Sequence, residues 1–438
     1  MRKAEKTTLT SLYDLVTGDE DARLCRDIPE DACRELPGNF FKHLISSTAT
    51  KIGDSLASAK LVIPWLLAAI GAPAFLTGLV VPIREAGSLI PQLFVAGFIR
   101  PYAYRKWFWV WGSVLEGAAV IAIAAVALTL SGTAGGWITI ALLVVFSLSR
   151  GVVSVASKDV LGKTVSKNRR GTLMGYAGAV AGLATMFVGL YTKARGSQTG
   201  QEGFFFGLLL AAGILWFLAA FVFSTIKETP GATGGGGNAI SKALSSLSLL
   251  KTDSEFRHFV ITRTLLLSTA LSFPFYAVMS RENLGAGLGG FGLLIIAGGL
   301  GDTLSAPIWG RLADKSSRLV MVWAALITAG LGAVLFAVTF IEIADSVREY
   351  MFALFFLIMG IAHGGARLGR KTYLIDMATP ETRPAYVAVS NTVIGILLLA
   401  GGGVGAVAQL FGTRYAILLL ACVALIAATS ALRLREVQ

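Results

Sequence analysis

Long apolar segments separated by short polar connections run through almost the whole chain. Segments such as 107–131, 136–157 and 319–341 hold at most one charged residue each, and each has the roughly 20 residues that an α-helix needs to cross the hydrocarbon core of a bilayer. They are too long, and alternate too little, to be the strands of an outer-membrane barrel. The pattern therefore predicts an all-α polytopic membrane protein.

The two halves of the chain repeat one another. Phe41-Lys42-His43 matches Phe256-Arg257-His258 at an offset of 215 residues, and Trp111 matches Trp323 at an offset of 212. Four further pairs share an offset of 213 residues: Lys158 with Lys371, Leu161 with Leu374, Arg170 with Arg383, and Gly182 with Gly395. Each match is weak, but a nearly constant offset between anchors so far apart indicates a duplicated bundle.

The repeat, combined with hydropathy, assigns six spans to each half. A polar tail of residues 1–40 comes first, and a bundle of residues 41–226 follows it. A linker of residues 227–255, with the glycine run Gly234–Gly237 that is typical of flexible linkers, leads to a second bundle of residues 256–438. The twelve expected spans are 42–65, 73–99, 107–131, 136–157, 171–192, 204–226, 257–280, 287–309, 319–341, 350–369, 385–409 and 413–432.

Hydropathy and the repeat disagree at the start of the first half. The most apolar window is 61–83, and taking it as the first span would leave Arg84 and Glu85 in an exposed loop. The repeat instead places both residues inside the second span, about 16 Å from its outer end and near the midplane. We follow the repeat; the alternative is that residues 39–60 form an amphipathic helix on the membrane surface.

Composition supports a membrane protein and excludes several other classes. The chain is 55% hydrophobic with a mean hydropathy of +0.70, which is more apolar than a soluble protein with a polar surface. The net charge of +12 does not indicate a nucleic-acid partner, because Lys and Arg are spread between the apolar segments. The sequence contains no complete phosphate-binding motif ending in Gly-Lys-Ser/Thr, no nucleophile constellation and no Cys/His cluster. We therefore expect neither an enzyme nor a cofactor or metal site.

Basic residues indicate the orientation. The connections after the second, fourth, eighth and tenth spans are rich in Lys and Arg, whereas the connections on the opposite side hold few. Because Lys and Arg are retained on the cytoplasmic side, we expect both termini in the cytoplasm and the protein in the inner membrane of a bacterium.

The connection between the eighth and ninth spans carries a motif, Gly310-Arg-Leu-Ala-Asp314-Lys315-Ser-Ser-Arg318. Together with twelve spans, repeated halves and a long central linker, it resembles the major facilitator superfamily over residues 41–433. The resemblance implies two six-helix bundles that rock about a central site, and a conformational role for Gly310, Asp314 and Arg318. The matching first-half loop, 97–106, lacks the aspartate, so we expect any conformational latch to depend on the second-half copy.

Charged residues inside the expected spans are the candidate functional residues, because each costs about 3 kcal/mol or more near the bilayer centre. Lys51 and Asp54 share one polar face of the first span with Ser47 and Ser58, at the helical spacing i, i+4, i+7 and i+11. A polar face on a spanning helix is expected to line a watery cavity.

Four further charges lie deep in the first half. Arg84 and Glu85 are adjacent and therefore point in different directions on a helix, so each is expected to find another partner, such as Asp54 or Lys51. Glu116, near the middle of the third span, either gains and loses a proton during transport or forms a static salt bridge. Arg150, in a sequence that loosely resembles a fourth-span motif of superfamily antiporters, either binds an anion or controls a carboxyl proton.

The second half is less charged. Arg263 lies near the start of the seventh span, Asp302 near the middle of the eighth, and Arg367 in the tenth on one face with His363. A membrane histidine can carry protons or bind a metal ion. Because no Met-rich or Cys pattern surrounds His363, we expect it to serve packing or hydrogen bonding.

These residues predict a secondary transporter for a small polar, anionic or zwitterionic solute, acting as a monomer with protons and the lipid bilayer as its further partners. The basic residues expected to bind the substrate are Lys51, Arg84, Arg150, Arg263 and Arg367. The acidic residues expected to couple transport to protons are Asp54, Glu85, Glu116 and Asp302. The alternative is a superfamily-like assembly factor, delivery protein or sensor that does not transport and that uses its tail and linker for docking.

Overall fold

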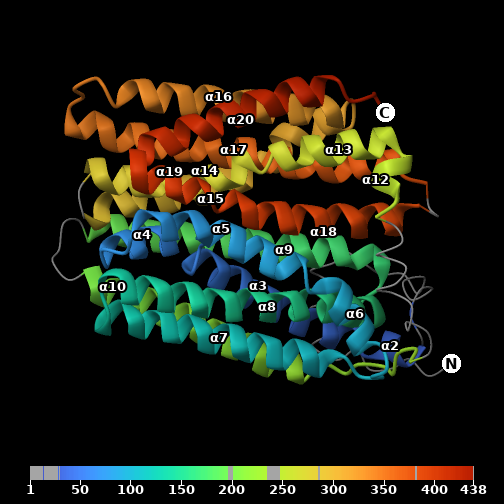
Figure 1. Cartoon of the computed structure of the whole chain (residues 1–438). Coiled ribbons are helices and arrows are strands. Elements are labelled where there is room, and N and C mark those ends of the chain that lie inside the picture. Colours follow the sequence, from blue (N-terminus) through green and yellow to red (C-terminus); the bar gives the residue numbers. More distant parts are fainter. Residues whose placement is uncertain are drawn as a thin grey trace.

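The computed structural model describes Tyr13, Ile28 and residues 30–195, 201–233, 247–284, 287–379 and 382–437. Within these residues the regular secondary structure is helical, without a strand, which confirms the predicted all-α class. Most helices run side by side along one direction, and α2 (Glu30–Arg34) lies at the same end of the molecule as the C-terminal residues (Figure 1). This end is called the terminal end below, and the opposite end the distal end.

The helices of the first half account for the lower part of Figure 1. After α2 they are α3 (Leu36–Leu56), α4 (Val62–Ala69), α5 (Ala74–Leu89), α6 (Gln92–Ile99), α7 (Lys106–Thr129), α8 (Gly132–Thr164), α9 (Lys167–Ala194) and α10 (Gln201–Ser224).

The helices of the second half form the upper part of the same view. They are α12 (Leu249–Thr252), α13 (Ser254–Leu265), α14 (Ser268–Leu284), α15 (Leu288–Ala313), α16 (Ser317–Val338), α17 (Asp345–Met377), α18 (Arg383–Gly401), α19 (Val404–Phe411) and α20 (Thr413–Leu432).

Eleven helices or helix pairs among the described residues are long and apolar enough to cross a membrane. They correspond to the second to twelfth expected spans; Ala74–Ile99, for example, coincides with the expected 73–99. The expected first span, 42–65, is not among them. α3 carries polar residues along its length, and α4 holds only 8 residues, which is too short to cross a bilayer alone.

Breaks divide several of the expected spans into two helices. Pro91 precedes α6, where its missing N–H interrupts the hydrogen-bond ladder after α5. Gly402 and Gly403 lie between α18 and α19. Between α3 and α4, residues 57–61 leave regular helix geometry, and this break positions Lys60, which belongs to the site described below.

Helix packing repeats between the halves. α7 packs against α8 and α10, and α16 packs in the same way against α17 and α20. The α5–α8 contact likewise corresponds to the α15–α17 contact. The halves meet where α9 contacts α15, where α5 contacts α18 and α19, and where α4 contacts α14. The three-dimensional arrangement thus follows the duplication that the sequence indicates.

Most of the polar tail, and the linker's Gly234–Gly237 run, lie outside the described residues. The described part of the tail packs onto the first half. Tyr13 and Ile28 are buried in a cluster with Phe40 of α3 and Leu173 of α9, and the Tyr13 ring meets the Phe40 ring edge-on at 5.3 Å.

Candidate functional site

Asp54 of α3 lies at the centre of a chain of ion pairs inside the first half. Its Oδ1 accepts a hydrogen bond from Nη2 of Arg84 in α5 at 2.9 Å, and its Oδ2 accepts one from Arg150 in α8. The guanidinium of Arg84 also lies over the Phe146 ring, 4.8 Å from its centroid. The expectation that Arg84 finds Asp54 as a partner is therefore confirmed.

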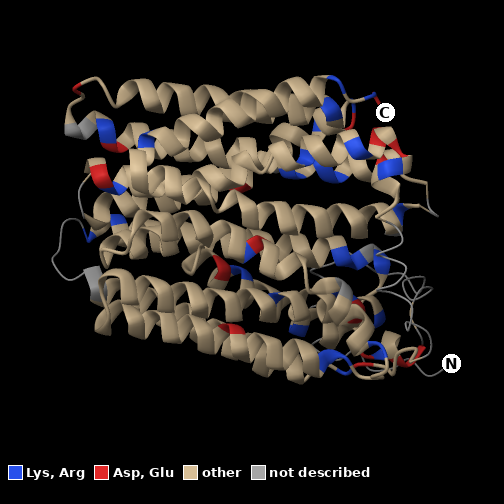
Figure 2. Cartoon of the chain, viewed as in Figure 1, with Lys and Arg blue, Asp and Glu red and all other residues tan. Residues whose placement is uncertain are grey.

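Arg150 links Asp54 to a second carboxylate. Its Nη1 lies 3.4 Å from Oε1 of Glu116 in α7. Glu116 is fully buried, and its Oε2 has no hydrogen-bond partner among the described residues. Four helices thus contribute one alternating series of charges, named here the buried charge chain: Arg84, Asp54, Arg150 and Glu116. Figure 2 shows charged residues inside the first-half helices, well away from the charged terminal end.

The charge chain is balanced, with two acidic and two basic groups. Burying such ions costs free energy that their mutual attraction must offset, so removal of a single partner leaves an uncompensated charge. A proton added to Asp54 would free both arginines from their shared carboxylate. The arrangement can therefore connect protonation of a carboxyl group with the availability of a guanidinium for another anion.

Lys60, which the sequence analysis missed, lies between the halves. Its Nζ is 4.7 Å from the centroid of the Phe273 ring in α14. The charges of Asp302 in α15 and Glu85 in α5 attract it, and those of Arg367 and Arg370 in α17 repel it. The signal available in the sequence is a lone lysine between two apolar stretches, close to the end of the expected first span.

Lys60 belongs to a cluster of six charged residues. Arg367 acts electrostatically on Lys51 as well as on Lys60, and Glu85 acts on Arg370. Lys51 also donates a hydrogen bond to the Met174 carbonyl of α9 at 3.4 Å. Basic members outnumber acidic members in this group, named the interhalf cluster: Lys51, Lys60, Arg367 and Arg370 with Glu85 and Asp302. The side chains of Glu85, Asp302 and Arg367 are exposed, so the cluster is accessible to a solute.

Arg263 is engaged mainly by α18, and the charge of Arg370 in the interhalf cluster also acts on it. It is buried, and its guanidinium donates hydrogen bonds to Ser390 Oγ at 2.5 Å and to Asn391 Oδ1 at 2.9 Å in α18. Nearby, Nδ1 of His363 lies 3.1 Å from Thr269 Oγ1, and its ring meets Phe273 edge-on. These contacts agree with the structural role expected for His363. Among the described residues no group of three His, Cys, Asp or Glu side chains could hold a metal ion.

The Gly310–Arg318 loop lies at the terminal end. Asp314 caps the C-terminus of α15 and is exposed. Arg318 pairs through Nε with Oε2 of Glu436 at 3.2 Å and donates a hydrogen bond to the Leu434 carbonyl at 3.1 Å. An ion pair and a hydrogen bond thus bind the loop to the residues that follow α20.

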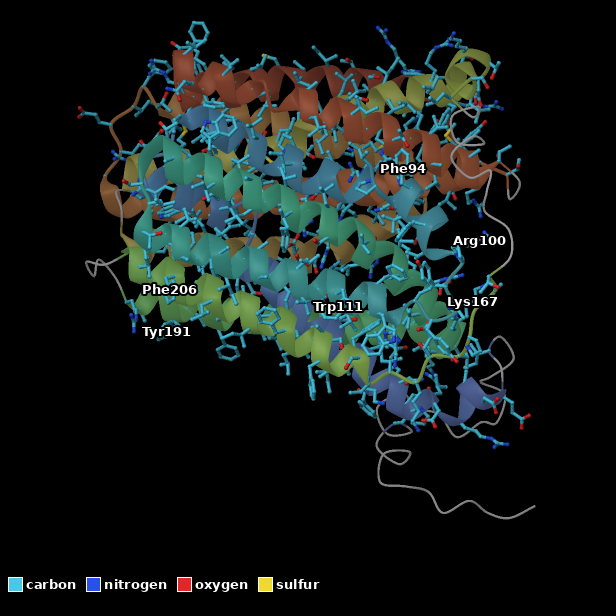
Figure 3. The ribbon with its side chains drawn as sticks, turned by 60° about the horizontal axis from the view of Figure 1, so that its bottom comes forward. Phe94, Arg100, Trp111, Lys167, Tyr191 and Phe206 are labelled. Atoms are coloured by element: carbon cyan, nitrogen blue, oxygen red, sulfur yellow. The ribbon has the colours of Figure 1, made fainter. Side chains whose placement is uncertain are left out.

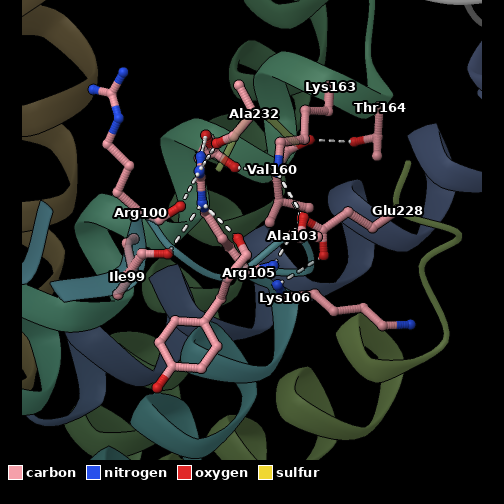
Figure 4. A network of polar contacts seen from close by, with 12 residues as sticks. Ile99, Arg100, Ala103, Arg105, Lys106, Val160, Lys163, Thr164, Glu228 and Ala232 are labelled. Atoms are coloured by element: carbon pink, nitrogen blue, oxygen red, sulfur yellow. Dashed lines mark hydrogen bonds and ion pairs between the residues drawn. The ribbon is translucent and has the colours of Figure 1, made fainter. Parts of the chain in front are cut away.

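The first-half loop, 97–106, is also bound by ion pairs and hydrogen bonds, although it has no aspartate of its own. Arg105 pairs with Asp159 of α8 and donates hydrogen bonds to backbone carbonyls that include that of Ala232. Glu228 accepts hydrogen bonds from the backbone N–H groups of Arg105 and Lys106, both at 2.9 Å, and pairs with Lys163 at 3.0 Å (Figure 4). Carboxylates distant in sequence, Asp159 and Glu228, thus bind this loop, whereas the expectation that a conformational latch depends on the second-half copy stays a prediction.

Comparisons with known proteins agree with this architecture. The sequence model of a family described as Major Facilitator Superfamily matches residues 259–438. Among curated proteins, none matches the sequence significantly.

Solved structures resemble about nine tenths of the chain. The crystal structure of the nucleoside transporter NupG has a TM-score of 0.66 and 10% identity, covering 90% of this chain and 98% of its own. A D-xylose-proton symporter reaches a TM-score of 0.67 at 14% identity, with coverage of 90% and 97%. A POT family transporter in complex with a thioalcohol-conjugated peptide reaches 0.68 at 11% identity, with coverage of 92% and 97%. At these identities the likeness is one of fold.

Proposed function

We propose that the chain is a member of the major facilitator superfamily, which the match of its second half to that family's sequence model supports, and that it is a secondary active transporter that moves a small polar anion or zwitterion by alternating access, coupled to protons. The proposal rests on two clusters of charged residues at the centre of the molecule. One is the balanced, buried charge chain in the first half, and the other is the more basic, accessible interhalf cluster beside it. Residues 41–226 and 256–438 are the two proposed moving bundles.

The proposed membrane topology has twelve spans, with α3 and α4 together as the first. Two features support it. Asp54 of α3 is neutralised by Arg84 and Arg150 within the protein, so its charge need not face lipid. Basic residues also gather at the terminal end (Figure 2), and this favours a cytoplasmic location for both termini, in a bacterial inner membrane.

The substrate class follows from the charge of the interhalf cluster. Four basic groups against two acidic ones leave an excess of positive charge in a place that solute can reach. A carboxylate or phosphate group would offset that excess, and an ammonium elsewhere on a zwitterion could pair with Glu85 or Asp302. Lys51, Lys60 and Arg367 are the first candidates for binding, whereas the Arg263 guanidinium already donates to Ser390 and Asn391.

Proton coupling is assigned to the buried charge chain. Protonation of Asp54 would release Arg150 and Arg84 toward a substrate anion, and deprotonation would draw both arginines back to the carboxylate. Glu116, which shares Arg150, would bias this exchange. A substrate and a proton would then bind together, which is the requirement for symport.

The test uses purified protein in liposomes that contain a pH-sensitive dye. Lactate, succinate, glutamate, glycerol phosphate, glucose and choline are added outside in turn. We expect an anion or zwitterion to acidify the interior, and glucose and choline to leave it unchanged. Asp54→Asn is expected to abolish the proton signal, whereas Glu30→Gln, in the tail helix α2, serves as a control that retains it.

Two outcomes would count against the proposal. A proton signal that survives single neutralisation of Asp54, Glu85, Glu116 and Asp302 would exclude coupling through these groups. Absence of transport for every charged solute, with cellular function lost on deletion of the tail but not on charge neutralisation, would favour the assembly, delivery or sensor role.

A further inference from the structure

An aromatic groove lies on the surface of the first half, between α7 and α8. Its volume is about 580 Å³, and its walls include Tyr102, Tyr104, Trp107, Trp111, Leu115 and Leu148. At the floor, a Cβ added to Gly112 would lie 2.6 Å from Val153 Cγ2 and 3.4 Å from the Ser149 carbonyl oxygen. The absence of a side chain at Gly112 therefore lets α7 and α8 approach closely, while the larger side chains around it form the walls.

The walls of the groove are apolar and exposed. Trp111 is 65% exposed, Leu115 51%, Trp107 49% and Leu148 47%. From Trp107 to Leu115 the groove follows α7 for about 12 Å, most of the roughly 15 Å depth of one leaflet's hydrocarbon. The groove therefore has the polarity and the length of a lipid acyl chain.

The terminal end of the groove is basic. Lys106 lies over the Trp107 ring, with its Nζ 5.2 Å from the centroid, and donates two hydrogen bonds to the carbonyls of Ser224 and Ile226. An ammonium has three donors, so one remains for a further acceptor. Arg100 is exposed at the same end, and Figure 3 shows it farther toward that end than Trp111.

The neighbouring acidic groups do not cancel this charge. Glu228 and Asp159 are paired with Arg105 and Lys163 at the base of the loop. Two acidic groups against Arg105, Lys106 and Lys163 leave a positive excess where a lipid phosphate would lie. Tyrosine rings at Tyr102 and Tyr104 sit at the same level, where aromatic residues with a polar tip are favoured in membranes.

The repeat indicates that this groove is a specific feature of the first half. Trp323 of α16 matches Trp111 and is similarly exposed, at 52%. At the same offset, however, Tyr102, Tyr104 and Trp107 correspond to Asp314, Ser316 and Leu319. The second half thus keeps one exposed tryptophan but neither the aromatic wall nor a purely basic mouth.

We propose that the groove binds one anionic phospholipid, with an acyl chain along Trp111 and Leu115 and its phosphate at the loop that carries Arg100 and Lys106. The site lies in the leaflet at the terminal end and is independent of the transported solute. It differs from ordinary annular contact in preferring a negative headgroup.

The experiment measures tryptophan fluorescence in vesicles that contain an equal, low mole fraction of either brominated phosphatidylglycerol or brominated phosphatidylcholine, in unbrominated phosphatidylcholine. Bromine quenches only tryptophans that it touches. The fluorescence of wild-type protein minus that of Trp111→Phe gives the fluorescence of Trp111 and its quenching by each lipid. The same subtraction with Trp323→Phe gives the quenching of Trp323, the matched control from the other half.

We expect brominated phosphatidylglycerol to occupy the Trp111 site about fivefold more than brominated phosphatidylcholine, the ratio that one basic residue near an anionic lipid supplies. We expect both brominated lipids to quench the fluorescence of Trp323 equally. Arg100→Gln is expected to reduce the preference at Trp111. Equal quenching of Trp111 by both lipids would reduce the groove to annular contact, and no quenching at all would mean that protein, such as a second copy of the chain, covers it. Either result would overturn the proposal.

Discussion

Gly78 of α5 and Gly405 of α19 are in direct backbone contact across the two halves. A Cβ added to Gly78 would lie 2.6 Å from the Gly405 backbone nitrogen. A second glycine contact stands in the corresponding place: a Cβ added to Gly292 of α15 would lie 2.7 Å from the carbonyl oxygen of Gly189 in α9. Gly292 follows Gly78 by 214 residues, and Gly405 follows Gly189 by 216, close to the offset of the repeat.

These contacts close the distal end of the molecule. Other contacts reinforce them there: Arg281 donates a hydrogen bond to the Ala68 carbonyl at 3.0 Å, and Trp65 packs against Phe291 with ring centroids 4.9 Å apart. In the proposed orientation, with both termini in the cytoplasm, this end is the outer side, and its closure corresponds to a state that is shut to the outside.

Replacing Gly78 with alanine should therefore open the distal end. The added methyl group cannot fit against the Gly405 backbone, so α5 and α19 must separate. Spin labels on cysteines at Thr129 and Phe340, in a variant without the native cysteines, should report a longer distance. Gly97→Ala is the matched control, because a Cβ there meets nothing within 4 Å. An unchanged distance in Gly78→Ala would show that the glycine contact does not hold this end closed.

The pair Asp54–Arg150 should show strong coupling in stability. Asp54→Ala leaves two arginines without their carboxylate, and we expect a loss of about 3–5 kcal/mol, the usual cost of removing one member of a buried ion pair. The double variant Asp54→Ala/Arg150→Met should lose less than the sum of the two single variants, because it removes charges of both signs. Thermal unfolding of the purified variants in detergent measures this, and strict additivity would contradict the pairing.

Lys60 should determine affinity for the anion. Lys60→Gln keeps a polar side chain that can donate a hydrogen bond but removes the charge that Asp302 and Glu85 attract. A hydrogen bond to a charged group contributes about 1.5–3 kcal/mol. We expect KM for the transported anion to rise about tenfold or more, with a smaller change in kcat. Lys193→Gln is the control, since Lys193 also lies over an aromatic ring, that of Tyr350, but at the distal end. Equal effects of the two substitutions would exclude a specific role for Lys60.

Arg84 should be inaccessible from outside. Its side chain is 16% exposed and is paired with Asp54. A cysteine at position 84, in a variant lacking Cys25, Cys33 and Cys422, should react slowly with a membrane-impermeant thiol reagent, whereas a cysteine at the exposed Glu342 should react fast. Rapid and constant labelling at position 84 would instead support the topology in which 61–83 is the first span.

Asp253 should make stability depend on pH at the start of α13. Burial acts to raise its pKa, but hydrogen bonds from the Phe256 N–H and the Tyr386 hydroxyl prevail and hold the pKa below its usual value. The carboxylate therefore stabilises the fold above the unfolded pKa of about 3.9, and this contribution is lost as pH falls toward the lower folded pKa. The difference in melting temperature between wild type and Asp253→Asn should be constant near neutral pH and shrink below about pH 4. A difference that does not vary with pH would contradict this.

The sequence by itself determined the helical class, the repeat and the positions of eleven spans, although the expected fourth and tenth spans, 136–157 and 350–369, end short of the observed Gly132–Thr164 and Val347–Met377. These follow from local physics: a bilayer fixes the length of an apolar helix, and proline and glycine mark where helices break. The repeat also identified Arg84 as an interior residue, where hydropathy alone would have left it in a loop.

The tertiary structure decided which charges meet. Sequence spacing placed Asp54, Glu116 and Arg150 in three separate spans, but their joining in one chain depends on how α3, α7 and α8 pack. Lys60 was overlooked for the same reason, since its role comes from charges on α5, α15 and α17 and not from its neighbours in the chain. Electrostatic energy depends on distance in space, and only the packing of helices fixes that distance.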